Sequence, residues 1–299
     1  MLIKVVKTGN GVAMHKKINV KEFVALTCGK WEIGACARLG GNMIYMRYDG
    51  EDIFRPLEDE EQILNNPYIQ GSPILLPANR TYLGKFSFEG CDYELPITEP
   101  RTNSHLHGLV HRAAFNVVSV GENEIVMSYS NTGEVYPFDF DMTVTYSVDD
   151  DGVSQKYVIT NTGKKNMPYT FCLHSTFAEP DEFIMPVKCR QEDFKDIPTG
   201  KFIPLTEQEE KYNTGSPSKN LHVCGYYVAD KKTARIGNIL YTVSDNFDCW
   251  ITYNARGLAG YICIEPQAGL VNGLNIDGGC PILAPGESVE YTTRYTAVN

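Results

Sequence analysis

Polar and apolar residues alternate along much of the chain, in runs that end at turn-forming residues. In the run 143–148 (Thr-Val-Thr-Tyr-Ser-Val) every second side chain is apolar, and Asp149–Gly152 follows as a turn. A second alternating run covers 153–160 and ends at Asn161-Thr162-Gly163. Because successive side chains of a strand point to opposite faces, this period of two predicts a half-buried β-hairpin.

The same pattern recurs elsewhere in the chain. Residues 116–130 bend at Gly121-Glu122-Asn123, and residues 31–54 are punctuated by Gly40-Gly41-Asn42 and by Asp49-Gly50. Strands that turn at this regular spacing are typical of a β-sandwich or a barrel.

Signals for other kinds of structure are few. The best helical candidate, Asp59–Asn66, is short, and we interpret the polar stretch Thr206–Asn220 as a surface loop. No low-complexity linker or internal repeat divides the 299 residues, of which 42% are hydrophobic. We therefore predict a single all-β domain over residues 1–299.

Charge and cysteine content narrow the function classes. The 27 basic and 37 acidic residues give a net charge of −10, which disfavours binding to nucleic acid or to an anionic membrane surface. No apolar run approaches the roughly 18 residues of a membrane-spanning helix, and the N-terminus lacks a signal-peptide pattern. The nine cysteines are scattered and include no C-x-x-C pair, which indicates neither a disulfide framework nor a zinc site. We expect a cytoplasmic protein in a reducing compartment.

Three of the six histidines lie within seven residues, at positions 105, 107 and 111. On a strand His105 and His107 would share one face, which would suit a metal site completed by a later carboxylate. The same spacing also fits a sugar-binding or acid–base site, or one hydrogen-bonded core histidine beside two exposed ones.

Three further residues are candidates for chemistry. His174 lies in the aromatic stretch 168–177, where loss of water would lower its pKa, as suits a general acid or an ordinary buried histidine. Glu265 follows an apolar run, on the same face as Cys263, and is costly to bury unless it is paired or at work; it can also be a rim glutamate. We expect Pro266 to end the strand there. Arg80 can bind a sugar hydroxyl or an anion, or simply pair with an acidic neighbour.

Six short segments carry a resemblance that covers most of the chain. They are Asn79-Arg80 with Gly84, Phe86 and 90–95 (GCDYEL); Leu106-His107-Gly108; Tyr136-Pro137-Phe138-Asp139-Phe140; Met167-Pro168 leading to His174 and Phe177; Ile264-Glu265-Pro266-Gln267; and 283–287 (LAPGE). In this order they resemble the motifs of the aldose 1-epimerase (galactose mutarotase) superfamily.

The resemblance implies a large antiparallel β-sandwich with a sugar-binding cleft across one sheet. It implies that Glu265 is the general base at the anomeric hydroxyl and His174 the general acid at the ring oxygen. His107 and Arg80 would hold the sugar, and Asn79 and Gln267, from the same motifs, are further substrate-binding candidates. Such a reaction needs an acid and a base on opposite sides of the reacting atoms, and no metal or cofactor.

Aromatic residues can stack on the apolar face of a sugar. From composition we expect Tyr82, Tyr136 and Phe177 to be candidates for this role.

The sequence also departs from the family pattern. Leu109 replaces the usual second glycine of L-H-G-G, as in divergent branches of the superfamily. No aspartate is evident in the region where galactose mutarotases carry a substrate-binding one, and Asn220 is its candidate replacement. His111 and Arg112 bring positive charge that could serve a phosphosugar.

Our leading hypothesis is mutarotation of an aldohexose. One alternative is a hexose-6-phosphate 1-epimerase, which would require a second basic group near Arg80. Others are a non-catalytic carbohydrate-binding protein and a metal-dependent β-barrel enzyme that uses His105, His107 and Glu265. The expected partner is a free or phosphorylated monosaccharide, and the expected assembly is a monomer or homodimer.

Overall fold

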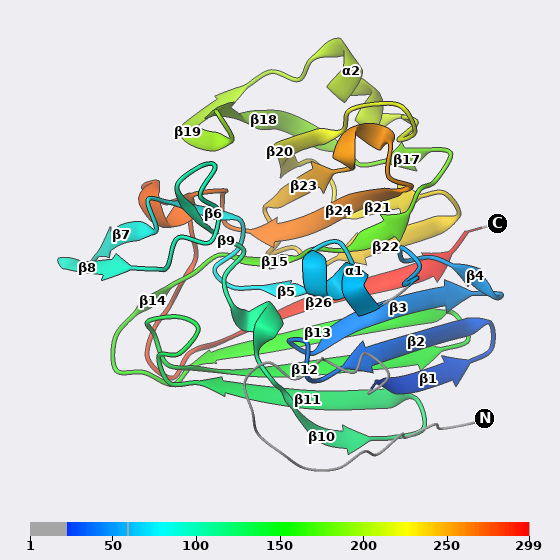
Figure 1. Ribbon diagram of the computed structural model, residues 1–299, viewed down its shortest axis with the longest axis horizontal. Coiled ribbons are helices and arrows are strands. Elements are labelled where there is room, and N and C mark those ends of the chain that lie inside the picture. Colours follow the sequence, from blue (N-terminus) through cyan, green and yellow to red (C-terminus); the bar gives the residue numbers. More distant parts are fainter. Residues whose placement is uncertain (1–22, 59, 299) are drawn as a thin grey trace.

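Two large antiparallel sheets form most of the computed structural model, which describes residues 23–58 and 60–298 (Figure 1). The first sheet has the strand order β10 (Asn116–Val120), β11 (Glu124–Asn131), β12 (Phe140–Asp149), β13 (Gly152–Asn161), β26 (Ser288–Ala297), β22 (Ile239–Val243), β21 (Thr233–Ile236) and β17 (Phe183–Ile184). The second has the order β19 (Ile197–Ile203), β18 (Val187–Phe194), β20 (Cys224–Ala229), β23 (Cys249–Tyr253), β24 (Tyr261–Ala268), β15 (Phe171–Leu173) and β5 (Ile74–Leu75), with β16 (Thr176–Ala178) also paired to β24.

Smaller elements flank these sheets. A four-stranded sheet contains β1 (Val24–Cys28), β2 (Trp31–Cys36), β3 (Asn42–Tyr48) and β4 (Glu51–Asp52), and its first two strands contact β12. Three two-stranded sheets pair β6 (Arg80–Tyr82) with β9 (Ser104–Leu106), β7 (Lys85–Phe88) with β8 (Cys91–Glu94), and β14 (Met167–Pro168) with β25 (Ile282–Leu283). The helical segments are α1 (Glu60–Asn65), α2 (Glu207–Glu210) and the short 3₁₀ turns η1 (Val110–Arg112), η2 (Lys211–Asn213), η3 (Ala255–Gly257) and η4 (Gly273–Asn275).

The predicted all-β antiparallel sandwich is confirmed, as are the three hairpin regions read from the alternation. For example, β12 and β13 pair in register from Phe140 with Asn161 to Asp149 with Gly152. The loop predicted over Thr206–Asn220 is wrong in part, because it begins with α2. Thr206 and Glu209 form a capping box there, in which each side chain accepts a hydrogen bond from the other's backbone N–H.

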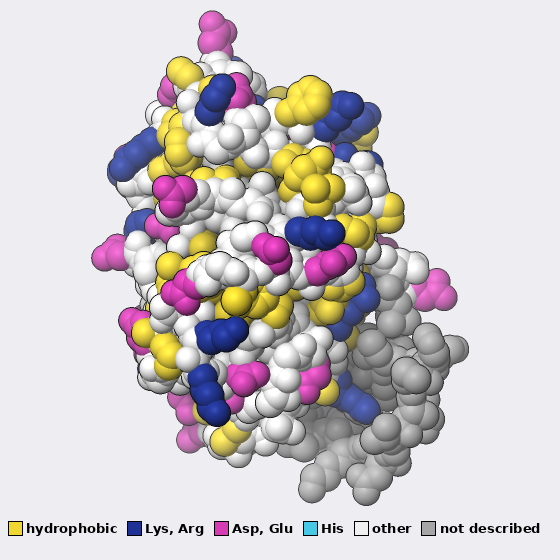
Figure 2. All heavy atoms as spheres, turned by 90° about the vertical axis from the view of Figure 1, so that its left-hand side faces the viewer, with side chains coloured by type: hydrophobic (Ala, Val, Ile, Leu, Met, Phe, Trp, Pro, Cys, Tyr) yellow, Lys and Arg dark blue, Asp and Glu magenta, His cyan; other side chains and the backbone are white. Residues whose placement is uncertain are grey.

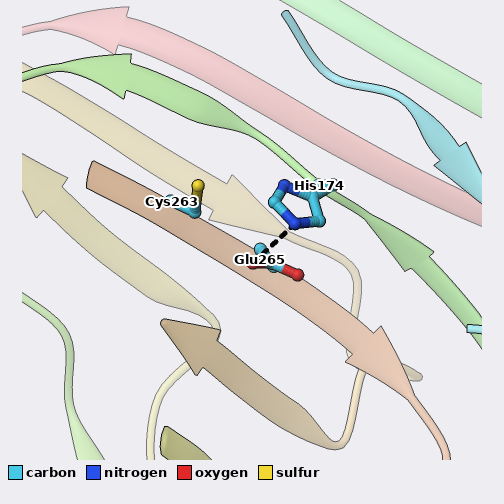
Figure 3. Close-up of side chains that lie close together, drawn as sticks. All are labelled: His174, Cys263 and Glu265. Carbon is cyan, nitrogen blue, oxygen red and sulfur yellow. Dashed lines mark ion pairs between the residues drawn. The ribbon is translucent and has the colours of Figure 1, made fainter. Parts of the chain in front are cut away.

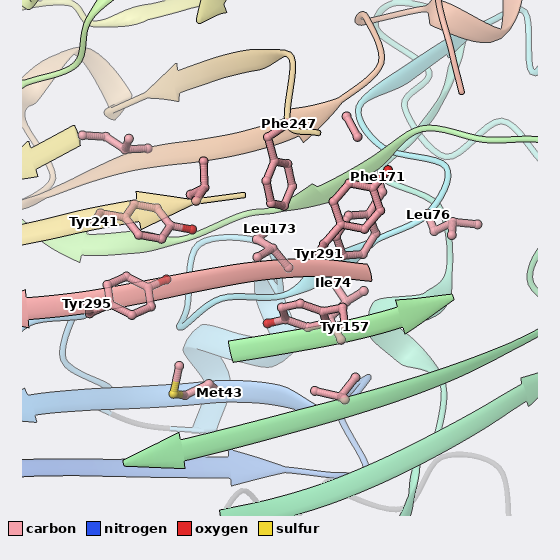
Figure 4. Close-up of a cluster of buried hydrophobic side chains, with 14 of the residues drawn as sticks. Met43, Ile74, Leu76, Tyr157, Phe171, Leu173, Tyr241, Phe247, Tyr291 and Tyr295 are labelled. Carbon is pink, nitrogen blue, oxygen red and sulfur yellow. The ribbon is translucent and has the colours of Figure 1, made fainter. Parts of the chain in front are cut away.

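The core lies between the two large sheets and is rich in aromatic rings (Figure 4). Tyr241 and Tyr295 of the first sheet stack with ring centroids 4.4 Å apart. Phe171 of the second sheet stacks on Tyr291 of the first at 4.7 Å. Each such buried side chain stabilises the fold by about 1.5–3 kcal/mol.

The molecular surface shows no dominance of one charge on the face drawn in Figure 2. Acidic and basic side chains are interspersed there with scattered apolar ones. Within the described residues, no helix is both long and apolar enough to cross a bilayer. The N-terminal segment, on which the expectation of no signal peptide rests, lies outside the described residues.

Candidate active site

Glu265 lies inside β24, on the face of the second sheet that points away from the core. Alternation places Ile262 and Ile264 in the core between the sheets, and Cys263 and Glu265 on the opposite face, as predicted for this pair. This opposite face is also covered, so that Glu265 is only 1% exposed.

The prediction that the strand ends at Pro266 is wrong, because β24 runs on to Ala268 and Pro266 pairs with Trp250. The backbone N–H of Ile264 bonds to Ser175 on the other side of β24, so by alternation the missing N–H of Pro266 also falls on that side. The neighbouring chain is interrupted there between β15 and β16. Proline therefore sits where the ladder has a gap.

His174 occupies this gap and reaches Glu265 directly (Figure 3). The imidazole Nε2 lies 3.3 Å from Glu265 Oε1, and the two side chains are 5% and 2% exposed. The next residue, Ser175, points into the core, where its hydroxyl shares hydrogen bonds with Ser72, Tyr241 and Tyr295. This buried hydroxyl network anchors, on the core side of the sheet, the backbone turn that carries His174.

Burial sets the protonation of this pair. It raises the pKa of Glu265 to about 8, against the opposing effects of a hydrogen bond from the Cys172 thiol and the charge of Arg80. It lowers the pKa of His174 to about 4. Between these values the pair carries one titratable proton, which lies on the carboxyl while the imidazole is neutral. Two groups that share one proton can donate at one atom while accepting at the other.

His107 lies beside His174 because of an unusual local backbone. Its φ is +63°, in the left-handed region, and its N–H bonds to the carbonyl of Asn79. Gly108 follows, where a Cβ would lie 2.0 Å from the carbonyl oxygen of Leu76, so only glycine fits. The His107 ring meets the His174 ring edge-on at 5.1 Å. Burial, together with the charges of His174 and Arg80, holds the pKa of His107 well below its usual range.

The prediction that His105 and His107 share a strand face is wrong. Strand β9 ends at Leu106, before the left-handed turn, and His105 Nδ1 bonds to the carbonyl of Pro96 at 2.7 Å. His105 is therefore a hydrogen-bonded buried histidine. His107 and His111 are also buried, at 8% and 3% exposure, so the alternative with two exposed histidines is wrong.

Arg80 approaches the site but is held by other protein groups. Its guanidinium donates two hydrogen bonds to Glu99, at 2.7 and 2.9 Å, and one to the hydroxyl of Tyr226 at 2.6 Å. Burial alone would raise the pKa of Glu99, but hydrogen bonds from Arg80 and Thr102 lower it to about 2. Glu99 therefore stays ionised and fixes the direction of the guanidinium.

The other two predicted ligands are buried near these residues. Asn79 is 4% exposed, with φ of +55°, and its side-chain oxygen makes no hydrogen bond within the described part of the chain. Gln267 lies on the same strand face as Glu265 and donates to the carbonyl of Gly269, which leaves its own Oε1 without a partner among the described residues.

Three aromatic residues and Asn220 are not where the sequence suggested. Tyr136 and Phe177 belong to the core, at 1% and 0% exposure, and Tyr82 is 42% exposed in a surface hollow lined also by Phe86 and Tyr93. Asn220 is exposed in a turn and bonds to the carbonyl of Gly257. It is therefore held in a surface turn of its own, not beside the catalytic pair.

Sequence reasoning missed Tyr68, Glu99 and Tyr226, because each reaches the site from a segment without a recognisable motif. Tyr68 packs on the His107 ring, with centroids 4.6 Å apart. Only the tertiary contacts identify these residues.

Among the described residues, the set whose donor atoms converge at metal-binding distances is His174, Cys263 and Glu265, all within 4.8 Å of one another. Burial raises the pKa of the Cys263 thiol well above its usual range, which disfavours the thiolate that a metal requires. The set of His105, His107 and Glu265 imagined for a metal enzyme does not converge in the described structure.

Comparison with known proteins shows the family of this chain and proteins of similar fold. The family model for aldose 1-epimerases matches residues 35–296. The fold is similar to that of a galactose mutarotase-like protein from Clostridium acetobutylicum (21% identity, 93% of this chain and 95% of that one, TM-score 0.85). It is also similar to a putative aldose 1-epimerase from Escherichia coli K12 (20% identity, 92% and 98%, TM-score 0.79).

A further solved structure, the GalM/aldose epimerase homologue from C. elegans, shares 18% identity over 93% of this chain and 99% of that chain, with a TM-score of 0.78. The YihR protein of E. coli K12 is 22% identical over 175 residues, which are 56% of this chain and span only 55% of that relative. The family match includes His174, Glu265 and most residues of the two large sheets. The chain therefore belongs to the aldose 1-epimerase family.

Proposed function

We propose that this protein is an aldose 1-epimerase that interconverts the α and β anomers of an aldohexose. The observation that carries this proposal is the buried contact of 3.3 Å between His174 Nε2 and Glu265 Oε1. Burial gives these two groups one proton to share near neutral pH. That is the protonation state an acid–base pair needs.

The reaction follows from this pair. One member removes the proton from the hydroxyl on C1, the bond between C1 and the ring oxygen breaks, and the other member protonates the ring oxygen. The carbonyl formed at C1 turns about the C1–C2 bond, and the reverse steps close the ring on the other face. The sequence-based expectation is an acid and a base on opposite sides of the reacting atoms, but the structure brings the two groups to 3.3 Å from each other. The two oxygens are bonded to the same carbon, so we propose that adjacent groups serve both of them.

We assign the general base to Glu265 and the general acid to His174. In the free protein the proton lies on the carboxyl, so these roles require it to pass from Glu265 to His174 when the sugar binds. Arg80 and His107 hold ring hydroxyls. Asn79 and Gln267 offer as acceptors their side-chain oxygens, which have no hydrogen-bond partner among the described residues.

The test is polarimetry of freshly dissolved single anomers of glucose, galactose, a few pentoses and the hexose 6-phosphates. Glu265→Gln and His174→Asn should each slow interconversion by about 10²–10⁴-fold. The exposed Glu122 and His222 give matched controls, Glu122→Gln and His222→Asn, which should keep full activity. Full activity in both site variants would show that this pair is not the catalyst. Tight sugar binding by a wild-type protein that does not speed anomer exchange would identify a binding protein.

A phosphorylated sugar would need a second basic group near Arg80. Among the described residues Arg101 lies there, but it contacts Glu99 and Asp196, so its charge is already compensated. We therefore propose a free sugar as the substrate, with the 6-phosphates as the comparison. We also propose that residues 1–299 act as one cytoplasmic domain, in line with nine cysteines that are all free.

A further inference from the structure

The segment 66–70, between α1 and β5, crosses the histidine cluster and places the ring of Tyr68 on it. The Tyr68 centroid lies 4.6 Å from that of His107, 4.8 Å from that of His111 and 6.3 Å from that of His174. The half-buried side chain of Tyr68 thus lies against His107, His111 and His174 together.

The two ends of this segment are anchored. At its start, the backbone N–H of Asn66 bonds to the carbonyl of Gln62. At its end, the side chain of buried Gln70 donates to the carbonyl of Arg55 at 2.6 Å, and its backbone carbonyl accepts from the side chain of Asn42 at 2.9 Å. The ends can therefore act as fixed points for movement of the residues between them.

The middle of the segment is held more weakly. Arg55, which lies 4.6 Å above the ring of Tyr261, donates a long hydrogen bond of 3.4 Å to the carbonyl of Ile69. Arg112 hydrogen bonds to the Tyr68 hydroxyl and lies beside His111, with Nε 3.2 Å from His111 Nε2. Residues 67–69 make no β-ladder, so their displacement would break few backbone bonds.

This arrangement closes the site. The side chains of His174 and Glu265 are 5% and 2% exposed, and a sugar cannot reach Nε2 or Oε1 until a covering group moves. Tyr68 is the covering side chain that contacts His174 and His107 and belongs to a short segment with fixed ends.

We propose that Tyr68 is a substrate-contacting residue that gates the site: its ring leaves the histidine cluster to admit the sugar and then packs against the apolar C–H face of the bound ring. The contact with sugar rests on the proposed function, whereas the gating does not. An aromatic ring suits this place because it exchanges one apolar contact surface for another. The cost of opening is the hydrogen bond between its hydroxyl and Arg112. Tyr68 then takes the role that composition alone suggested for Tyr82, Tyr136 and Phe177.

The gating is tested without any sugar, by histidine modification with diethyl pyrocarbonate read by mass spectrometry. In the wild-type protein, His107 and His174 should react much more slowly than exposed His222. Tyr68→Ala removes the ring contacts that keep the site closed. It should therefore raise the modification rate at His107 and His174 by about tenfold and leave the rate at His222 unchanged. Tyr68→Phe, which keeps the ring, should have a smaller effect.

Equal rates at His107 and His174 in wild type and Tyr68→Ala would overturn the gating. The wild-type comparison with His222 stands even if Tyr68→Ala folds poorly, because rapid modification of His174 in the wild-type protein would by itself refute a closed site.

The contact with sugar is tested by kinetics on whichever anomer the wild-type protein turns over. Tyr68→Ala should raise KM by about tenfold and change kcat less, because it removes contact with the bound ring and leaves the catalytic pair in place. The control is Phe202→Ala, which removes a ring that is 48% exposed and should leave both constants unchanged. An unchanged KM in Tyr68→Ala would refute the contact. If the wild-type protein turns over no anomer, the proposed function fails and the modification experiment still decides the gating.

Discussion

Replacing Glu265 by Gln should stabilise the protein by an amount that grows with pH, while it slows anomer interconversion. The ordinary pKa of the carboxyl is 4.5, and burial raises it to about 8 in the folded state. A carboxyl with a raised folded pKa contributes its full stability below the unfolded pKa and loses it as the pH rises through the folded pKa. Glutamine keeps the shape of the side chain and has no proton to lose.

The size of the effect follows from these two pKa values. Ionisation of this carboxyl in the unfolded chain lowers the free energy of unfolding of the wild-type protein. At about 1.36 kcal/mol per pKa unit, the decrease is about 1 kcal/mol at pH 5, about 3 at pH 7 and about 5 at pH 9. The free energy of unfolding of Glu265→Gln minus that of wild type should increase by these amounts. His174 is present in both proteins, so its own titration cancels to first order.

The assay is urea unfolding of both proteins at pH 5, 7 and 9, followed by circular dichroism, with Glu122→Gln as the exposed control. The control should differ from wild type by the same small amount at every pH. A difference between Glu265→Gln and wild type that stays constant from pH 5 to 9 would show that the carboxyl is not desolvated in the folded protein, and the assignment of a shared proton would fail with it.

Three further predictions concern the same site. The catalytic pair has lost its proton above pH about 8 and gained a second below about 4, so kcat/KM measured by polarimetry should fall on both sides of that window; a rate that keeps rising to pH 10 would contradict the pair. Ser175→Ala removes the buried hydroxyl shared by Tyr241 and Tyr295 and should lower the free energy of unfolding in urea by about 1–3 kcal/mol; no loss would mean that the network does not hold this turn. Glu99→Gln breaks the paired hydrogen bonds that orient Arg80 and should raise KM about tenfold more than it lowers kcat, whereas equal KM values would show that Arg80 needs no such support.

The alternation of polar and apolar residues determined the strands, because the period of two is a property of neighbouring residues alone. It gave the hairpin of β12 and β13 with its turn, and it placed Cys263 and Glu265 on one face of β24. The helix start at Thr206 also carried a local signature, Thr-x-x-Glu, that can be read without coordinates. Motif order was sufficient to nominate Glu265, His174, His107 and Arg80.

Only the tertiary structure decided how these residues meet. His174 touches Glu265 because β15 and β16 break beside Pro266, and that depends on the pairing of strands far apart in the chain. The left-handed turn at His107 and the position of Tyr68 depend in the same way on segments that pack from elsewhere. Local sequence sets which face of a strand a side chain points to. The register of distant strands sets which residues cover that face and exclude water from it. This exclusion of water shifts the pKa values of Glu265 and His174.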